Sequence, residues 1–265
     1  MFENGIKVRL IIMVAVAGFS YVSYLSKTSV NPVTGQKQHI GMNVDQEIAM
    51  GLQSAPEMAS QMGGEVPSSA PIAQLVSKVG MTLVNSTEAA SSPYAGHFQF
   101  HTLADQETVN AFALPGGQIF ITQGLIKRMD PDRIEDEMSG VLGHEIGHVI
   151  ARHSAQQMAK QDLEKGLVNA AVMGSGSYSG AQIASYVGNM ISLKYGRNDE
   201  LEADHFGVRY SSQSGHDPNA MIRVMEILEQ VMAGHRQSEF MSTHPSPENR
   251  IVKLKEEIAQ LQNGK

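Results

Sequence analysis

Apolar side chains recur at helical spacing in two segments of the chain. Residues 43–62 and 71–84 carry them about three or four positions apart, as amphipathic helices do. Between residues 98 and 102 aromatic and polar side chains alternate instead, and two further short runs flank a turn at 115–117, which together predict three strands. From residue 131 onward the pattern is almost entirely helical. We therefore predict an α+β fold with a small antiparallel sheet between helices.

A different pattern occupies the N-terminus, where residues 10–26 carry no charge and follow Lys7 and Arg9. The run is slightly shorter than the about 20 residues of a bilayer span, but longer than the about 7–15 of a signal-peptide core. We expect residues 1–30 to be an uncleaved membrane anchor and residues 31–265 to form the folded domain. A cleaved signal peptide and a buried core helix are the alternatives. Because the two cations precede the run, the positive-inside tendency places the folded domain outside the cytoplasm.

The composition narrows the classes of partner and cofactor. The 265 residues include 27 acidic and 20 basic side chains, a net charge of -7, so there is no overall positive field for nucleic acid and none is expected as a partner. The chain has no cysteine, which excludes disulfides, thiol nucleophiles and metal sites built on thiolates. Any metal must therefore be held by histidine, aspartate or glutamate.

Candidate chemistry is concentrated at residues 144–148, which read HEIGH, the H-E-x-x-H pattern, inside the predicted helix 131–157. Four residues advance a helix by about 400°, so His144 and His148 project from nearly the same side and can share one metal ion. Glu145 lies on the adjoining flank, where it can take a proton from a metal-activated water. Taken alone, the pentapeptide could also be a chance match on an amphipathic helix.

A catalytic zinc site needs a third protein ligand. The extension H-E-x-x-H-x-x-G-x-x-H does not supply it, because Ala151 and Ser154 stand where that pattern has its glycine and last histidine. His153 lies nine residues from His144, about 900° along a continuous helix, and so on the opposite face. We interpret His153 as a structural or surface histidine.

A second acidic segment offers the missing ligand. Residues 198–204 read NDELEAD, and Glu200 and Asp204 are four apart, so they face the same way, whereas Glu202 points about 160° from Glu200. This spacing suits Glu200 as the metal ligand and Asp204 as the acceptor of a ligand histidine's free N–H. Without HEIGH nearby, the same residues would be read as a solvated helix face.

Four ordered motifs carry a family resemblance: VNAFALPGGQIFITQGLI, GVLGHEIGHVIARHS, RNDELEADHFGV and THPSPENR. Together they resemble the HtpX-like and CAAX-prenyl-protease-like zinc metallopeptidases, gluzincins of metallopeptidase family forty-eight, and in architecture the bacterial envelope proteases of the BepA and LoiP type. The resemblance implies a compact zincin fold, a zinc ion on His144, His148 and Glu200, and endopeptidase activity.

Two further elements have open interpretations. His244 matches a family motif beside the active site, and it either stabilises the oxyanion, acts as a removable fourth zinc ligand, or is structural. Ala111, Phe112 and Ala113 could form a strand edge that pairs with an extended substrate. The alternative for this segment is an ordinary core hairpin.

These observations predict a membrane-anchored zinc endopeptidase in the bacterial envelope, with its catalytic domain in the periplasm. Its expected partners are the membrane, through the N-terminal segment, and polypeptide substrates, namely unfolded or misassembled envelope proteins. Glu145 would carry a proton from water to the leaving amine. The alternative is a membrane-tethered binding or assembly factor that keeps the fold without turnover.

Overall fold

The computed structural model describes residues 2–175, 195–233, 244 and 250–263. The chain divides into two compact units. The first comprises Met1–Asn31, Gly35–Met42 and Ala155–Lys194, and the second comprises Pro32–Thr34, Asn43–Ser154 and Tyr195–Lys265. Each unit is described by itself.

Helix α1 (Phe2–Ser26) dominates the first unit, together with the hairpin of β1 (Thr28–Val30) and β2 (Lys37–His39) and most of α6 (His153–Ser175). Lys7–Ser26 is the one span in the described residues that is long and apolar enough to cross a membrane, and none of its side chains is buried. Phe19, for example, is 76% exposed. This exposure is what a lipid-facing helix requires, and it fits the expected membrane segment rather than a core helix.

The second unit contains the sheet and the remaining helices. Its helices are α2 (Val44–Gln61), α3 (Pro71–Asn85), α4 (Gln123–Ile126), α5 (Ile134–Ile150), α8 (Arg197–Gln213), α9 (Ala220–Ala233) and α11 (Arg250–Asn263), with short 3-10 turns at Glu88–Ser91, Ala95–His97 and Pro131–Arg133. Helix α2 begins where the sequence predicts, because Asn43 and Gln46 cap it reciprocally. Helix α3 begins with Pro71, whose fixed φ suits a first helical position.

Three strands form the sheet, β3 (Gln99–Leu103), β4 (Ala111–Leu114) and β5 (Gln118–Thr122), in the order β3-β5-β4. The hairpin β4–β5 is antiparallel, but β3 pairs with β5 in parallel. The predicted α+β class is confirmed, whereas the expectation of a purely antiparallel sheet is wrong. Side-chain alternation shows which residues share a face, but it carries no information about the direction of a neighbouring strand.

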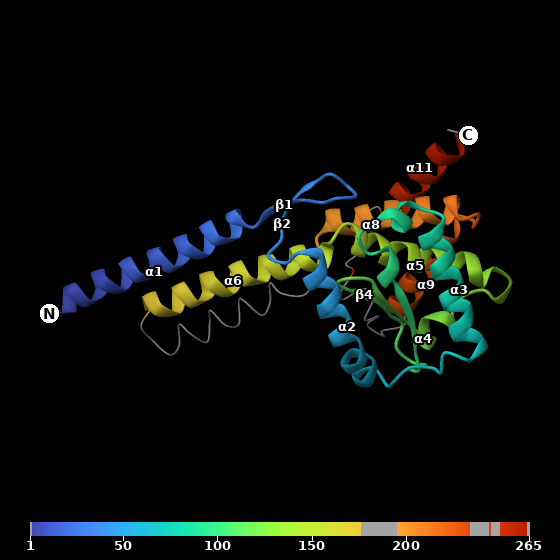
Figure 1. Ribbon diagram of the computed structural model, residues 1–265, viewed down its shortest axis with the longest axis horizontal. Helices are drawn as coiled ribbons and strands as arrows, with labels where there is room; N and C mark the ends of the chain where they lie inside the picture. Colours follow the sequence, from blue (N-terminus) through green and yellow to red (C-terminus); the bar gives the residue numbers. More distant parts are fainter. Residues whose placement is uncertain (1, 176–194, 234–243, 245–249, 264–265) are drawn as a thin grey trace. The chain divides into compact units, whose positions relative to one another are not determined.

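Helices cover both faces of the sheet, with α2 and α3 on opposite sides of β4 in Figure 1. Ile119 and Ile121 of β5 belong to the main core with residues of α3 and α5, while Phe120 joins a smaller cluster with Ala55 and Ala59 of α2. The hairpin turn sits tightly on α2, since a Cβ on Gly116 would lie 2.4 Å from the Cα of Ile48. Strand β5 is therefore buried on both faces and holds the unit together.

Helix α5 runs through the centre of the second unit, and every residue from Glu137 to Ile150 is buried. It meets α8 backbone to backbone at glycines: a Cβ on Gly143 would lie 3.1 Å from the Cα of Gly207, and one on Gly147 would lie 2.7 Å from the Cβ of Phe206. Gly143 and Gly147 thus allow the two helices to approach closely. This close approach brings the HEIGH segment beside the acidic first turns of α8.

Candidate metal centre

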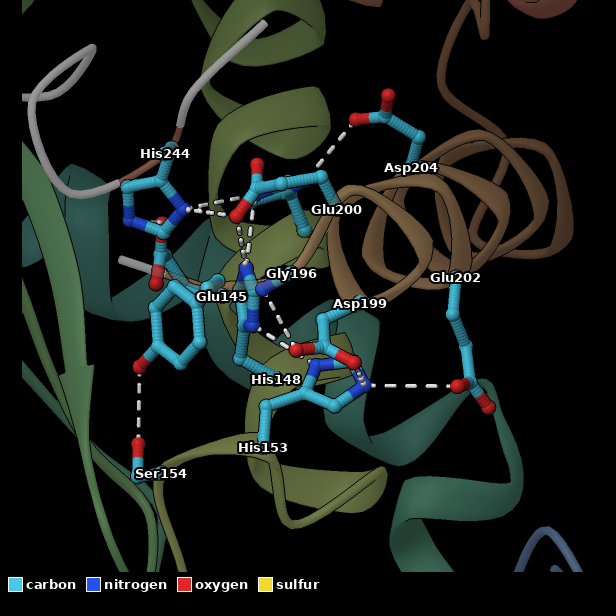
Figure 2. Close-up of polar contacts among 12 residues, drawn as sticks. Glu145, His148, His153, Ser154, Gly196, Asp199, Glu200, Glu202, Asp204 and His244 are labelled. Atoms are coloured by element: carbon cyan, nitrogen blue, oxygen red, sulfur yellow. Dashed lines mark hydrogen bonds and ion pairs between the residues drawn. The ribbon is translucent and has the colours of Figure 1, made fainter. Parts of the chain in front are cut away.

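Four buried side chains offer ligand atoms that all lie within 4.8 Å of one another: His144 and His148 of α5, Glu200 of α8, and His244. The Nε2 atoms of His144 and His148 are 3.0 Å apart, and each lies 3.6 Å from an oxygen of Glu200. Figure 2 shows His148, Glu200 and His244 converging on one point. The sequence-predicted ligands are therefore brought together, with His244 among them.

The spacing of these atoms fits a tetrahedral metal ion. Ligand atoms at about 2.0–2.2 Å from zinc are separated by about 3.3–3.6 Å. The two separations between histidine and Glu200, 3.6 Å each, agree with this range, and the two Nε2 atoms lie slightly closer at 3.0 Å. The Oε2 atom of Glu200 is buried and has no hydrogen-bond partner in the described parts of the chain, although Nη1 of Arg250 lies 3.3 Å away, so this oxygen can ligate a metal ion. Burial lowers the pKa of His144 and, further, that of His148, so both rings are neutral and can ligate.

His144 is held from behind by a carboxylate and an arginine. Oδ1 of Asp204 lies 3.0 Å from Nδ1 of His144, and Arg250 donates to both carboxylate oxygens of Asp204, at 2.5 and 2.6 Å. Burial alone would raise the pKa of Asp204, but the charge of Arg250 and the hydrogen bonds outweigh it and lower that pKa. An ionised Asp204 can accept the Nδ1–H of His144, which leaves Nε2 free for a metal.

His148 is held differently, by His153, which is a structural histidine as one of its two interpretations had it, and not a surface residue on the opposite face. Helix α5 ends at Ile150 instead of continuing to residue 157, and α6 begins at His153. His153 is 1% exposed, its Nδ1 lies 2.9 Å from Nδ1 of His148, and its Nε2 lies 3.4 Å from Glu202. Figure 2 shows this chain running from His148 through His153 to Glu202. The argument from a continuous helix failed because the helix is broken.

Glu145 points into the site and makes no side-chain hydrogen bond within the described residues. Both carboxylate oxygens are buried and lack hydrogen bonds to any described residue, and Nε2 of His244 lies 3.7 Å from Oε1. Burial raises the pKa of Glu145 to about 7, with His244 opposing the rise and Glu200 adding to it. A carboxyl group with a pKa near neutrality is suited to both accept and donate a proton.

Two residues of the site escaped the sequence analysis. Tyr195 stacks on the ring of His148 with centroids 4.2 Å apart, and its hydroxyl lies 2.9 Å from Oγ of Ser154. Arg250 is 2% exposed despite its charge. A lone tyrosine carries no signal in the sequence, but Arg250 closes the motif THPSPENR and could have been found as part of it.

The predicted substrate strand is β4, which contains Ala111, Phe112 and Ala113. Among the described residues this strand pairs only with β5, so it forms one edge of the sheet. Ala111 is fully buried and Ala113 nearly so, while Phe112 is partly exposed. The side chains of the two alanines belong to the main core, so at these two positions only the backbone could contact a ligand.

The chain is similar in sequence to several proteins that are named as proteases. The chain is 27% identical over 242 residues to the beta-barrel assembly-enhancing protease of Escherichia coli, which covers 87% of this chain and 47% of that protein. It is 30% identical over 253 residues to the mitochondrial metalloendopeptidase OMA1 of Schizosaccharomyces pombe, covering 94% and 71%, and 28% identical over 245 residues to the metalloprotease YcaL of Escherichia coli, covering 88% and 94%.

The chain spans about half the length of the beta-barrel assembly-enhancing proteases that it matches. Residues 73–258 match the sequence profile of Peptidase family M48, a range that contains HEIGH, Glu200 and His244. The match confirms the family that the four motifs predict, and with it the metallopeptidase class. The chain belongs to peptidase family M48.

Proposed function

We propose that this protein is a membrane-anchored zinc endopeptidase. One observation carries the proposal: the buried set of His144, His148 and Glu200 converges beside a carboxylate, Glu145, whose oxygens have no hydrogen-bond partner in the described chain. A non-catalytic binding factor would gain nothing from an unsatisfied buried carboxyl, which costs stability. The geometry therefore supports an enzyme over the alternative of a tethered assembly factor.

In the proposed reaction the chain's own residues hold the metal and move one proton. Zinc supplies Lewis acidity, which activates a water molecule and polarises the scissile carbonyl. His144, His148 and Glu200 are the residues that would hold it. Glu145, with its pKa raised to about 7, accepts the proton of the attacking water and returns it to the leaving amine. No covalent bond between enzyme and substrate is required.

His244 is proposed as a latch on this centre. Its Nδ1 lies 3.4 Å from Nε2 of His144 and 3.0 Å from Oε1 of Glu200, distances that suit a fourth ligand. A catalytic zinc needs one open position, so a ligand there holds the enzyme at rest until it is displaced. The rival role, donation to the oxyanion, is favoured only by Nε2, which faces Glu145 at 3.7 Å.

The substrates we propose are unfolded or misassembled envelope proteins, bound by their backbone along β4. The support is the edge of this strand that pairs with no other described strand and lies next to α5, together with relatives that include bacterial proteases named for beta-barrel assembly. Ala111 and Ala113 are buried, so neighbouring residues must move before a peptide pairs along the whole strand. The exposed apolar helix Lys7–Ser26 supports anchoring in the inner membrane, with the catalytic domain in the periplasm.

The first test is cleavage of casein by the purified full-length protein supplied with zinc. Wild type should cleave, whereas Glu145→Gln should not, although its zinc content and melting temperature should stay near wild type because Glu145 is not a ligand. Retained cleavage by Glu145→Gln would remove the proposed proton carrier. Absence of cleavage by wild type after addition of zinc would favour the binding factor.

The latch has its own test, because the two roles of His244 predict opposite results. As a latch, His244→Ala should raise casein cleavage, since the fourth position is then open. As an oxyanion donor, the same change should lower the rate by about 10²–10³-fold. A rate equal to wild type would make His244 a structural residue.

A further inference from the structure

A buried cluster outside the proposed ligand set lies at the end of α5. Glu47 of α2 and Arg152 form an ion pair, with Nε of Arg152 3.0 Å from Oε1 of Glu47 and Nη2 also bonded to it. Tyr94 donates its hydroxyl to the other oxygen of Glu47 at 2.7 Å. Glu47 is 1% exposed and Arg152 is 5% exposed. Burying two charges costs free energy, because both lose their hydration. A structural role of this ion pair would account for that cost.

Arg152 also has an unusual backbone. Its φ is 59°, and it is the only non-glycine residue with positive φ in the described chain. For an L-amino acid the left-handed conformation costs about 1–2 kcal/mol, so it persists only when the surroundings hold it. The ion pair to Glu47 supplies that hold, because it fixes the side chain of the strained residue against another helix. The result is a left-handed turn at Arg152, between the end of α5 at Ile150 and the start of α6 at His153.

This turn determines where His153 lies. In a continuous helix the residue five positions after His148 would be rotated by about 500°, or 140° from it, and could not meet its ring. Because the chain turns at Arg152, the Nδ1 atom of His153 instead lies 2.9 Å from the Nδ1 atom of His148. The ring stacks of His148 do not replace this contact, since a stack fixes no N–H.

The hydrogen-bond chain has one consistent direction if His148 ligates through Nε2. Nδ1 of His148 then carries the proton and donates it to Nδ1 of His153, whose Nε2–H is directed to Glu202 at 3.4 Å. His148 is oriented in this way by a neutral ring, whereas His144 is oriented by the ionised Asp204. The two proposed metal histidines thus have different outer supports.

We propose that Glu47 and Arg152 are positioning residues of the metal centre: their ion pair holds the left-handed turn that delivers His153 to His148. The proposal rests on the zinc site proposed above. Glu47 lies on a separate helix and is not a ligand. The proposal predicts that substitutions at Glu47 and at His153 both weaken zinc binding by removing the contact between His153 and His148.

The experiment is a double-mutant cycle on the zinc dissociation constant of the full-length protein in detergent, measured by competition with a chelator. His153→Ala should weaken zinc binding by about 10–100-fold, as loss of an outer partner does, and Glu47→Gln should weaken it within the same range. Because both act through one contact, the double variant should bind no more than about twofold more weakly than the weaker single variant. Substitution of cobalt for zinc should show the same altered visible spectrum in both single variants.

The matched control is Glu135→Gln, which breaks an exposed ion pair to Lys78 at the start of the same helix α5. Its zinc constant and cobalt spectrum should equal those of wild type. Two outcomes would overturn the positioning role without affecting the proposed zinc site. In one, the two losses of zinc affinity multiply in the double variant. In the other, Glu47→Gln folds and has the zinc dissociation constant of wild type. Failure of wild type to bind zinc would instead overturn the proposed function.

A second pair of variants applies if Glu47→Gln does not fold. Arg152→Gly and Arg152→Ala both remove the guanidinium and leave Glu47 with the hydroxyl of Tyr94 but without its cation. Only glycine adopts the left-handed turn without cost. If the turn conformation governs zinc binding, Arg152→Gly should bind zinc severalfold more tightly than Arg152→Ala. Equal constants would overturn the proposal.

Discussion

Arg250 offers a sharp test of how the site is supported, because it is a buried cation whose removal leaves an uncompensated charge. It donates to both oxygens of Asp204, at 2.5 and 2.6 Å, and its Nη1 lies 3.3 Å from Oε2 of Glu200. In Arg250→Ala, Asp204 would keep its hydrogen bond to His144 but lose the positive charge that lowers its pKa.

The expected loss of stability follows from the burial of both partners. Removing one member of a buried ion pair typically costs about 3–5 kcal/mol, whereas removing one from an exposed pair costs about 0–1 kcal/mol. For a domain of this size each kcal/mol lowers the melting temperature by about 2–4 °C, so Arg250→Ala should melt about 6–20 °C below wild type. Arg250→Lys should recover only part of this, because an ammonium group cannot bind both oxygens of Asp204 in parallel.

The assay is thermal unfolding of metal-stripped protein, so that differences in metal occupancy do not contribute. The control is Lys78→Ala, which removes the cation of the exposed pair with Glu135 and should melt close to wild type. The double variant Arg250→Met/Asp204→Asn should melt above Arg250→Ala, since Asp204, the carboxylate that Arg250 binds with two hydrogen bonds, then carries no charge. A melting temperature for Arg250→Ala within about 2 °C of wild type would refute the reasoning.

Three further predictions concern α8. Glu200→Ala should weaken zinc binding by more than about 100-fold and Glu202→Ala by less than about 10-fold, since Glu202 contacts the metal centre only through a histidine. Equal losses of affinity, measured by chelator competition, would show that the wrong ligand was chosen. Gly207→Ala should lower the melting temperature by several degrees, because its Cβ would lie 3.1–3.2 Å from the backbone of α5; an unchanged value would show that the two helices can separate freely. The hydrogen bond to Glu257 raises the pKa of half-exposed His205. The stabilisation of the folded state by this bond is therefore complete below about pH 6.5 and is lost as the pH rises through the raised pKa. His205→Gln should therefore lower the melting temperature more at pH 5.5 than at pH 8.5, and a pH-independent difference would contradict this.

Several features of the fold were determined locally and could be predicted from the sequence. Helix α2 starts where Asn43 caps it, α3 starts at Pro71, and the turn between β4 and β5 contains Gly116 and Gly117, both with positive φ. The pair of His144 and His148 also follows from local spacing, because two residues four apart on any helix share a face. Caps, turns and helical periods act over a few residues, so they can be read without knowing the rest of the chain.

Other features depend on residues distant in sequence, and only the tertiary structure decided them. The direction of β3 is set by its pairing with β5, although β4 lies between these two strands in the sequence. His244 and Arg250 lie 100 and 106 positions from His144, and contacts over such distances are not recorded in any short sequence pattern. His153 is the clearest case: its position depends on a left-handed turn at Arg152. That turn costs energy locally and persists because Glu47, 105 positions away, holds the arginine.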